Sequence, residues 1–245
     1  MANDIVYFIT TPENLEFVKT QAGKIEYQIK NVLLMGGSRI GQKTIQSLPT
    51  SFNTKVLERD RDKSFALAEK LNHSLIINCD GRNIEVLKEE GIQEMDAFVA
   101  VTANSEANIL ACLAAKRLGV KKTVAEVENI DYILLAESLD IGTVINKKMI
   151  AASYIYQLTL DADVLNVRSL TSADAEVVEF VAKAGSKITR SQIKDINLPD
   201  DVNIGGIVRD GVGIIVFGYT EILPDDHVIV FCVSSAIRKV ESFFN

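Results

Sequence analysis

A glycine-containing stretch, residues 31–41 (NVLLMGGSRIG), holds the residues of this sequence best suited to bind an anion. Its apolar run 31–35 predicts a buried strand, and the glycines lead directly into residues 39–48, where apolar side chains recur at roughly helical spacing. The first turn of a helix offers unpaired N–H groups and the positive end of the helix dipole, which together hold a phosphate. This strand–turn–helix context separates a nucleotide-binding fingerprint from a chance cluster of glycines.

A carboxylate stands where that fingerprint expects one. Glu58 ends the next predicted strand, 54–58, and lies 22 residues after Gly36. The dinucleotide fingerprint places an acid about 20 residues further on, where it accepts hydrogen bonds from an adenosine ribose. The spacing therefore predicts that the chain holds an adenine nucleotide.

The middle position of the motif departs from G-x-G-x-x-G, because Ser38 stands where glycine is expected. That glycine lets the backbone approach the pyrophosphate, so a Cβ takes some of the room. Serine is small, and its hydroxyl can donate to a phosphate oxygen. Two interpretations stay open: a functional nucleotide site, or a domain that keeps the turn and has lost its ligand. A nucleophile elbow is disfavoured, since Ile40 occupies the position of its last glycine.

The elements that would position these residues alternate between short apolar runs and helical segments. The predicted strands are 31–35, 54–58, 75–79, 97–101, 122–127 and 143–145. The predicted helices between them are 39–48, 61–71, 83–90, 105–118 and 130–139. Such alternation indicates βαβ units. Residues 31–146 are therefore predicted to form an α/β, Rossmann-like, doubly wound parallel sheet.

The pattern changes after residue 146. Residues 147–160 predict one helix that is apolar on nearly every face, and such a helix needs burial on more than one side. We expect it to cross between domains or to pack against a second subunit; a core helix of one domain is the alternative. Residues 161–245 predict a small α+β domain with mostly hairpin connections. Its predicted strands are 164–169, 175–182, 202–209, 213–217 and 228–233, and its helices lie near 191–196 and 235–244.

The two ends of the chain resemble each other. Residues 4–11 align without a gap on residues 226–233, and the same offset of 222 places Leu15 on Ile237 and Val18 on Val240. We interpret residues 1–30 as the final strand and helix of a preceding repeat plus a linker. The first strand would then lack its own sheet. A chance likeness between two strand–helix pairs is the alternative.

Composition excludes several classes of protein. The formal net charge of −7 argues against general nucleic-acid affinity, and no apolar run approaches the length of a membrane span. Residues 1–30 show no secretory signal. The three cysteines, Cys79, Cys112 and Cys232, are widely spaced in apolar runs and indicate reduced core residues of a cytosolic protein. The two histidines lack neighbours for a zinc site.

Several motifs taken together resemble those of one known family. They are Gly36–Gly41 with Glu58 and Arg59, Asp80 after the third strand, the stretches 100–108 and 114–119, and, in the second domain, 198–199, 204–209 and 225–229. The chain resembles the RCK family (TrkA-N, also called KTN, followed by TrkA-C) of regulators of potassium conductance. Within that family it is most similar to the second half of the regulatory subunit of a Trk-type uptake system.

The resemblance implies a ligand and its contacts. The ligand would be NAD(H), with ATP or ADP as the alternative. Glu58 would hold the ribose hydroxyls, while Asp80, Thr102 and Ala103 would line the adenine or second-ribose side. Arg59 could stack on adenine or reach phosphate. The equally plausible alternative is that Arg59 is an exposed charged residue with no contact to the ligand. The phosphates would contact the glycine motif, whose last residue is Gly41, at Gly36, Gly37, Ser38, Arg39 and Ile40.

The resemblance also implies partners. Such proteins are not enzymes; they form rings of RCK units beneath a transmembrane potassium transporter subunit, on the cytoplasmic face of the membrane, and pass on nucleotide binding as a shape change. We therefore expect a homo-oligomer, at least a dimer. The competing functions are an NAD-dependent oxidoreductase and a structural repeat that binds nothing. An oxidoreductase needs a catalytic Lys, His or Tyr facing the nicotinamide, and the second domain holds only one histidine, His227.

A last pair of carboxylates, Glu126 and Glu128, lies at the end of the fifth predicted strand. The period of two puts both on one face, and similar positions serve calcium-gated relatives of the family. Asn104 in the neighbouring loop would leave such a cage with few charges. A solvated strand end is the favoured interpretation, so no metal ligands are predicted.

Overall fold

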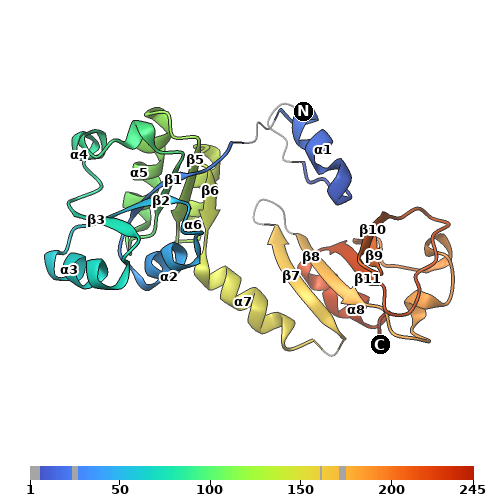
Figure 1. Ribbon diagram of the computed structural model, residues 1–245. Coiled ribbons are helices and arrows are strands. Elements are labelled where there is room, and N and C mark those ends of the chain that lie inside the picture. Colours follow the sequence, from blue (N-terminus) through green and yellow to red (C-terminus); the bar gives the residue numbers. More distant parts are fainter. Residues whose placement is uncertain (1–5, 24–26, 161, 171–174) are drawn as a thin grey trace. The chain divides into compact units, whose positions relative to one another are not determined.

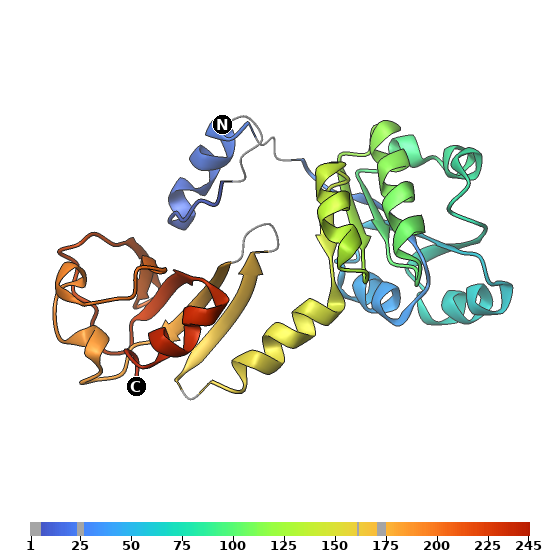
Figure 2. The same cartoon turned by 180° about the vertical axis from the view of Figure 1, so that it is seen from behind.

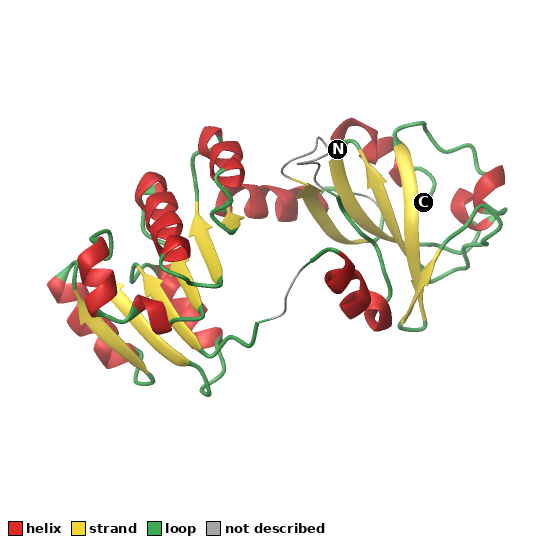
Figure 3. Cartoon of the chain, turned by 90° about the horizontal axis from the view of Figure 1, so that it is seen from above, coloured by secondary structure: helices red, strands yellow, loops and turns green. Residues whose placement is uncertain are grey.

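The structure is a computed structural model that describes residues 6–23, 27–160, 162–170 and 175–245. The chain divides into two compact units, one of Glu26–Lys148 and one of Met1–Ile25 together with Met149–Asn245. Each contains one sheet, and Figure 3 shows the strands of both in yellow. No helix among the described residues is long and apolar enough to cross a bilayer.

The first unit is built on a parallel sheet of six strands in the order β3-β2-β1-β4-β5-β6. The chain runs outward from the centre through β2 to β3, returns to β4 and then runs outward the other way. This topology confirms the predicted Rossmann-like doubly wound sheet. The strands are β1 (Asn31–Met35), β2 (Asn53–Glu58), β3 (Ser74–Asn78), β4 (Ala97–Ala100), β5 (Lys122–Glu126) and β6 (Thr143–Ile145).

Helices cover both faces of this sheet, with α2 and α3 on one face and α4 and α5 on the other (Figures 1 and 2). The helices are α2 (Arg39–Ser47), α3 (Arg61–Lys70), α4 (Ile84–Glu89), α5 (Ser105–Arg117) and α6 (Asp131–Ser138), with a 3-10 turn η2 at Ile92–Glu94. Four of the five begin at a side chain that accepts a hydrogen bond from the first turn, namely Ser38, Asp60, Asn83 and Asn104.

Burial on both faces explains why the central strand is apolar throughout. Leu33 and Leu34 are fully buried, and because neighbouring strand residues point to opposite faces, each belongs to a different layer. Leu34 packs with Ile45 of α2 and Leu67 of α3. The chain leaves the carboxyl ends of β1 and β4 in opposite directions, so a crevice opens there. This switch point is where a doubly wound sheet binds its ligand.

The second unit holds an antiparallel sheet of five strands in the order β10-β9-β11-β8-β7. Phe180 of β8 stacks on Phe244 beyond α8, with ring centroids 4.4 Å apart, and both are fully buried. The predicted small α+β domain is thus confirmed. Its strands are β7 (Val164–Leu170), β8 (Ala175–Val181), β9 (Val202–Arg209), β10 (Val212–Ile215) and β11 (His227–Cys232).

The helices of this unit are shorter than the sequence pattern predicts. The helix expected near 191–196 is a 3-10 turn, η4 (Ile193–Asp195), preceded by another, η3 (Lys187–Thr189). The last helix, expected over 235–244, is a 3-10 turn η5 (Ser234–Ala236) followed by α8 (Ile237–Glu241). Helical turns this short are held by packing on the sheet rather than by their own hydrogen bonds.

Helix α7 (Lys147–Gln157) ends three residues before the predicted boundary at 160. The described part of the chain buries none of the helix residues, so the alternative of a core helix is wrong for that part. Its exposed apolar side chains are Ile150, Tyr154 and Ile155, followed by Leu158 just beyond the helix.

The amino-terminal segment forms a 3-10 turn η1 (Pro12–Asn14) and helix α1 (Leu15–Gln21). The strand predicted over 4–11 is wrong for the described part, since residues 6–11 pair with no strand; residues 4 and 5 lie outside the described residues. Ile9 instead lies over the face of β9, where a Cβ on Gly205 would come within 3.1 Å of its side chain. Strand β9 already pairs with β10 and β11 and has no free edge. That residues 1–30 derive from a preceding repeat stays a prediction.

Candidate nucleotide-binding site

The turn after β1 passes very close to the end of β4. The Gly36 N–H donates to the carbonyl oxygen of Leu57 at 2.9 Å, and Gly36 has a φ of +109°. A Cβ built there would lie 3.0 Å from backbone atoms of Val101 and Thr102. Both the backbone angle and the lack of space therefore require glycine at this position.

Glu58 holds this turn in place. Its Oε2 accepts from the Gly37 N–H at 2.9 Å, and its Oε1 accepts from the Asp60 N–H at 2.9 Å. Gly37 has no room for a side chain, because a Cβ would collide with Leu67 of α3. A carboxylate has about four lone-pair sites, so Glu58 keeps capacity to accept from ribose hydroxyls as well.

Ser38 is the N-cap of α2. Its Oγ accepts from the Gly41 N–H at 3.2 Å, which leaves the hydroxyl proton free to be donated. Among the described residues, no group accepts a hydrogen bond from the N–H of Ser38, Arg39 or Ile40. Three backbone donors and one hydroxyl thus meet at the positive end of a nine-residue helix, the arrangement that binds a phosphate.

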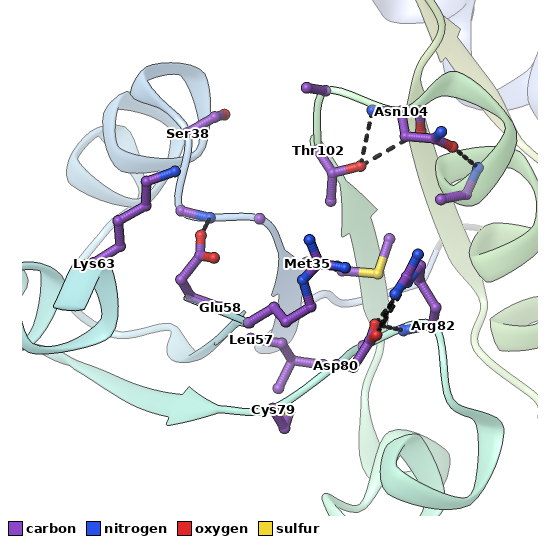
Figure 4. A pocket seen from close by; sticks show the side chains of 16 residues that line it. Met35, Ser38, Leu57, Glu58, Lys63, Cys79, Asp80, Arg82, Thr102 and Asn104 are labelled. Atoms are coloured by element: carbon purple, nitrogen blue, oxygen red, sulfur yellow. Dashed lines mark hydrogen bonds and ion pairs between the residues drawn. The ribbon is translucent and has the colours of Figure 1, made fainter. Parts of the chain in front are cut away.

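These groups open into a pocket of about 310 Å³ at the switch point (Figure 4). Met35 and Leu57 form part of its lining, and both approach Gly81, where a Cβ would lie 2.8 Å from Met35. Eight of the predicted site residues line this pocket: Gly36, Gly37, Ser38, Glu58, Arg59, Asp80, Thr102 and Ala103.

The three remaining predicted residues lie beside the pocket. Gly41 packs under the turn, where a Cβ would collide with the carbonyl oxygen of Gly36. Arg39 lines a shallow neighbouring hollow on the other side of Ser38, and the Ile40 side chain is half-exposed. Arg39 and Ile40 can therefore offer the pocket their backbone N–H groups but not their side chains, and Gly41 supplies close packing.

Asp80 is engaged by a residue that the sequence pattern did not single out. Arg82 Nε donates to Asp80 Oδ1 at 2.8 Å, and Arg82 Nη2 donates to Oδ2 at 2.5 Å. The side-chain hydrogen bond from Arg82 lowers the pKa of Asp80 to about 2. The pair places a fixed anion and a fixed cation together on the wall formed by the β3–α4 turn (Figure 4).

Lys63 is the second cation that sequence reasoning missed. It lies in the first turn of α3 and extends toward the glycine turn beside Ser38 (Figure 4). Its ammonium group has no ion-pair or hydrogen-bond partner among the described residues. With Glu58 and Asp80 as anions and Arg59, Lys63 and Arg82 as cations, the pocket lining carries one net positive charge. The position of Lys63 just after the helix cap Asp60 was the only signal in the sequence.

Glu126 and Glu128 face a lysine. Lys147, the first residue of α7, forms ion pairs with both carboxylates, at 2.9 Å to Glu126, and Lys148 lies 3.4 Å from Glu128. The hydrogen bond from Lys147 lowers the pKa of Glu128. Across the part of the chain that the structure describes, no group of three or more His, Cys, Asp or Glu residues is placed to hold a metal ion.

Comparison with known proteins assigns both units of the chain to known domain families. Residues 32–147 match the TrkA-N domain and residues 177–245 match the TrkA-C domain. The chain belongs to the family that joins these two domains, and the resemblance to RCK proteins is confirmed.

The chain is similar along its length to several curated relatives. It is 31% identical over 247 residues to the Trk system potassium uptake protein TrkA of Vibrio alginolyticus, covering 99% of this chain and 54% of that protein. The protein of that name from Haemophilus influenzae is also 31% identical, with the same coverage. A Methanosarcina mazei homologue is 30% identical over 245 residues, covering 99% of this chain and 55% of the homologue. The chain spans about half the length of these relatives.

Solved structures with the same fold include the GsuK RCK domain, with a TM-score of 0.56 and 14% identity over 94% of this chain and 52% of that one. The GsuK channel matches with a TM-score of 0.57 and 14% identity over 90% of this chain and 40% of that one. At this level of identity the likeness shows a shared fold.

Proposed function

We propose that this chain is a nucleotide-binding regulatory part of a potassium uptake system, and that its ligand is NAD(H), with ATP or ADP as the alternative. The observation that carries the proposal is the set of free donors at the start of α2. The N–H groups of Ser38, Arg39 and Ile40 have no acceptor among the described residues, and they open toward the pocket that Glu58 lines. Such a donor set suits a pyrophosphate.

The remaining groups of the pocket suit the rest of a nucleotide. Glu58 would accept from the ribose hydroxyls while it keeps the Gly37 N–H. Lys63 would approach the phosphates, and Arg59 is placed to stack on a base or to reach a phosphate. Asp80, Arg82, Thr102 and Ala103 would line the adenine or second-ribose side.

The relatives support the regulatory role by name, since they are called Trk system potassium uptake proteins. One structural neighbour is described as a GsuK channel bound to NAD, with a TM-score of 0.55 and 15% identity over 90% of this chain and 40% of that one. Because that likeness concerns the fold, the choice of ligand rests on the residues of the pocket. We propose that the chain catalyses no reaction. We propose further that it assembles into a homo-oligomeric ring on the cytoplasmic face of the membrane, held there by a transmembrane potassium transporter subunit.

Calorimetric titration of the whole chain with NAD, NADH, ADP, ATP and NADP tests the ligand. Glu58 repels a 2′-phosphate and accepts from a free 2′-OH, so NADP should bind far more weakly than NAD. Glu58→Ala should weaken binding by about 1–3 kcal/mol, the usual scale for losing a hydrogen-bonded charge. Glu69→Ala, an exposed change on α3, is the matched control.

Two outcomes would contradict parts of this proposal. Equal affinity for NADP and NAD would remove Glu58 from the role of ribose acceptor. Absence of binding by all five nucleotides would favour a structural repeat that holds no ligand.

A further inference from the structure

Asn108, in the first turn of α5, is completely buried and uses its full hydrogen-bonding capacity. Its Oδ1 accepts from the Thr102 N–H at 3.1 Å and from the Thr102 hydroxyl at 2.6 Å. Its Nδ2 donates to the carbonyl oxygen of Thr102 at 3.0 Å and to that of Glu126 at 2.8 Å. An asparagine side chain has two lone pairs and two donor hydrogens, so all four are occupied.

These bonds join the candidate nucleotide pocket to the carboxyl end of β5. Thr102 lines the candidate nucleotide pocket at the end of β4. Glu126 is the last residue of β5, and its side chain, 4% exposed, pairs with Lys147 at the start of α7. A second link runs beside the first, because Ser105 Oγ accepts from the N–H of Glu128 at 3.0 Å. Asn108 therefore bonds directly to both the pocket loop and the strand end that anchors α7, and Ser105 of the same helix holds Glu128.

We propose that Asn108 is a positioning residue that couples occupancy of the nucleotide pocket to the anchoring of α7 through Glu126 and Lys147. This proposal rests on the proposed function, because it requires a nucleotide in the pocket. It adds the residue through which nucleotide binding affects the start of α7, the helix that leads out of the first unit.

The physical reason lies in the burial of Asn108. A displaced Thr102 loop would either carry Asn108 and the end of β5 with it or leave buried donors and acceptors without partners. The second course is unfavourable, because water does not reach a fully buried amide to replace the lost bonds. The pocket loop and the strand end should therefore shift together.

Coupling of this kind is reciprocal, so it is measurable from the α7 end. Lys147→Met removes the ion pairs with Glu126 and Glu128 without touching the pocket. We expect this variant of the full chain to bind NAD about fivefold more weakly in calorimetry, the low end of usual coupling factors. In an Asn108→Ala background, the same substitution should change NAD affinity by less than about twofold, because the bonds that join Thr102 to Glu126 through Asn108 are already cut.

The control background is Thr123→Val. Thr123 is also buried on β5, and its hydroxyl donates to the carbonyl oxygen of Ile141 at the end of the strand away from the pocket. The fivefold effect of Lys147→Met should persist in this background. If Asn108→Ala does not fold, Asn108→Asp serves instead, since it keeps the acceptor for the Thr102 N–H and hydroxyl and loses the donors to the carbonyl oxygens of Thr102 and Glu126.

A second measurement uses amide hydrogen exchange. Saturating NAD should slow exchange in residues 147–157 of the unmodified chain but not of Asn108→Asp. An equal effect of Lys147→Met in wild-type and Asn108 backgrounds, or no effect in the wild type, would overturn the coupling alone. A flat NAD titration of the unmodified chain would overturn the proposed function and the coupling with it.

Discussion

Glu58 shows how one side chain can serve both a fold and a ligand. Its carboxylate accepts from the N–H groups of Gly37 and Asp60, so it ties the glycine turn to the end of β2. The same carboxylate lines the pocket in which a ribose would lie. Substitution at Glu58 should therefore lower nucleotide affinity partly through the turn itself.

Lys63 gives a prediction that separates phosphate from base recognition. Lys63→Met should weaken ADP binding by about 1 kcal/mol, or about fivefold, because the ammonium group lies beside the turn that we propose holds the phosphates. Adenosine binding should not change, and the loss for ADP should shrink at high salt. Lys70→Met, at the far end of α3, is the control. Equal losses for ADP and adenosine in calorimetry would contradict a phosphate contact.

Cys79 offers a probe of the pocket that needs no mutation. It is half-buried in the pocket lining, and burial raises its pKa, with added effects of Glu90 and Asp80. Cys112 and Cys232 are buried, and burial raises their pKa values to about 12 and about 11. Because the thiolate reacts, alkylation should be slow near neutrality, should speed up as pH rises, and should occur first at Cys79.

Bound nucleotide should protect Cys79 from a thiol-reactive probe, as followed by mass spectrometry of the labelled peptides. Cys79→Ser should abolish the early phase of labelling. Identical labelling rates with and without saturating NAD would place the ligand elsewhere.

At the scale of elements, the site depends on the fit between the glycine turn and α2. Gly41 lies in the first turn of α2, and a Cβ there would collide with the carbonyl oxygen of Gly36 and lie 3.1 Å from Leu34. The backbone oxygen cannot move aside unless the whole turn moves. This packing explains why a glycine closes the motif even though it does not line the pocket.

Gly41→Ala should therefore lower the free energy of unfolding by about 2 kcal/mol and weaken nucleotide binding, because the turn must move. Chemical denaturation and calorimetry measure the two effects. Gly213→Ala in β10 is the matched control, since its nearest neighbours would lie 3.9 Å from the new Cβ; its change should stay within about 0.5 kcal/mol. A stable Gly41→Ala protein with normal binding would show that the turn is more adaptable than its contacts indicate.

At the scale of the whole molecule, α7 presents apolar side chains that no described part of the chain buries. Ile150 and Tyr154 are each 61% exposed, and Ile155 is 62% exposed. Exposed apolar surface of this extent on one helix marks a site of association. The chain spans about half the length of the relatives it matches. We propose a second copy of the chain as the partner that covers this surface.

The unmodified chain should be at least a dimer at protein concentrations of tens of micromolar, because such concentrations lie well above the usual dissociation constants of oligomers. Ile150→Glu or Tyr154→Glu should shift it toward monomer or insoluble aggregate, with little effect on nucleotide affinity. Phe65→Glu, an equally exposed apolar position on α3, controls for the change of charge. Analytical ultracentrifugation measures the outcome, and a stable monomer at these concentrations would count against the ring.

Most of the fold could be predicted because the period of apolar residues records burial directly. The six parallel strands lie within a residue of their predicted limits, and the glycine turn with Glu58 marks the switch point. The strand predicted over 4–11 was wrong for the described residues 6–11, because likeness to the strand at 226–233 does not show whether a sheet edge is free to pair with the segment. In the described part, Ile9 packs on a face of β9 instead.

The sequence by itself determined the class of the domains, the turn that suits a phosphate and the acid opposite it, because these depend on residues close in the chain. Only the tertiary structure decided which charges complete the site. The local sequence does not show that Lys63 and Arg82 line the pocket, and the motif stretch 100–108 does not show what its last residue, Asn108, contacts. These residues gain their roles from elements far apart in sequence that meet at one edge of the sheet. Distances between such side chains depend on how helices pack on strands, and packing is a property of the folded chain as a whole.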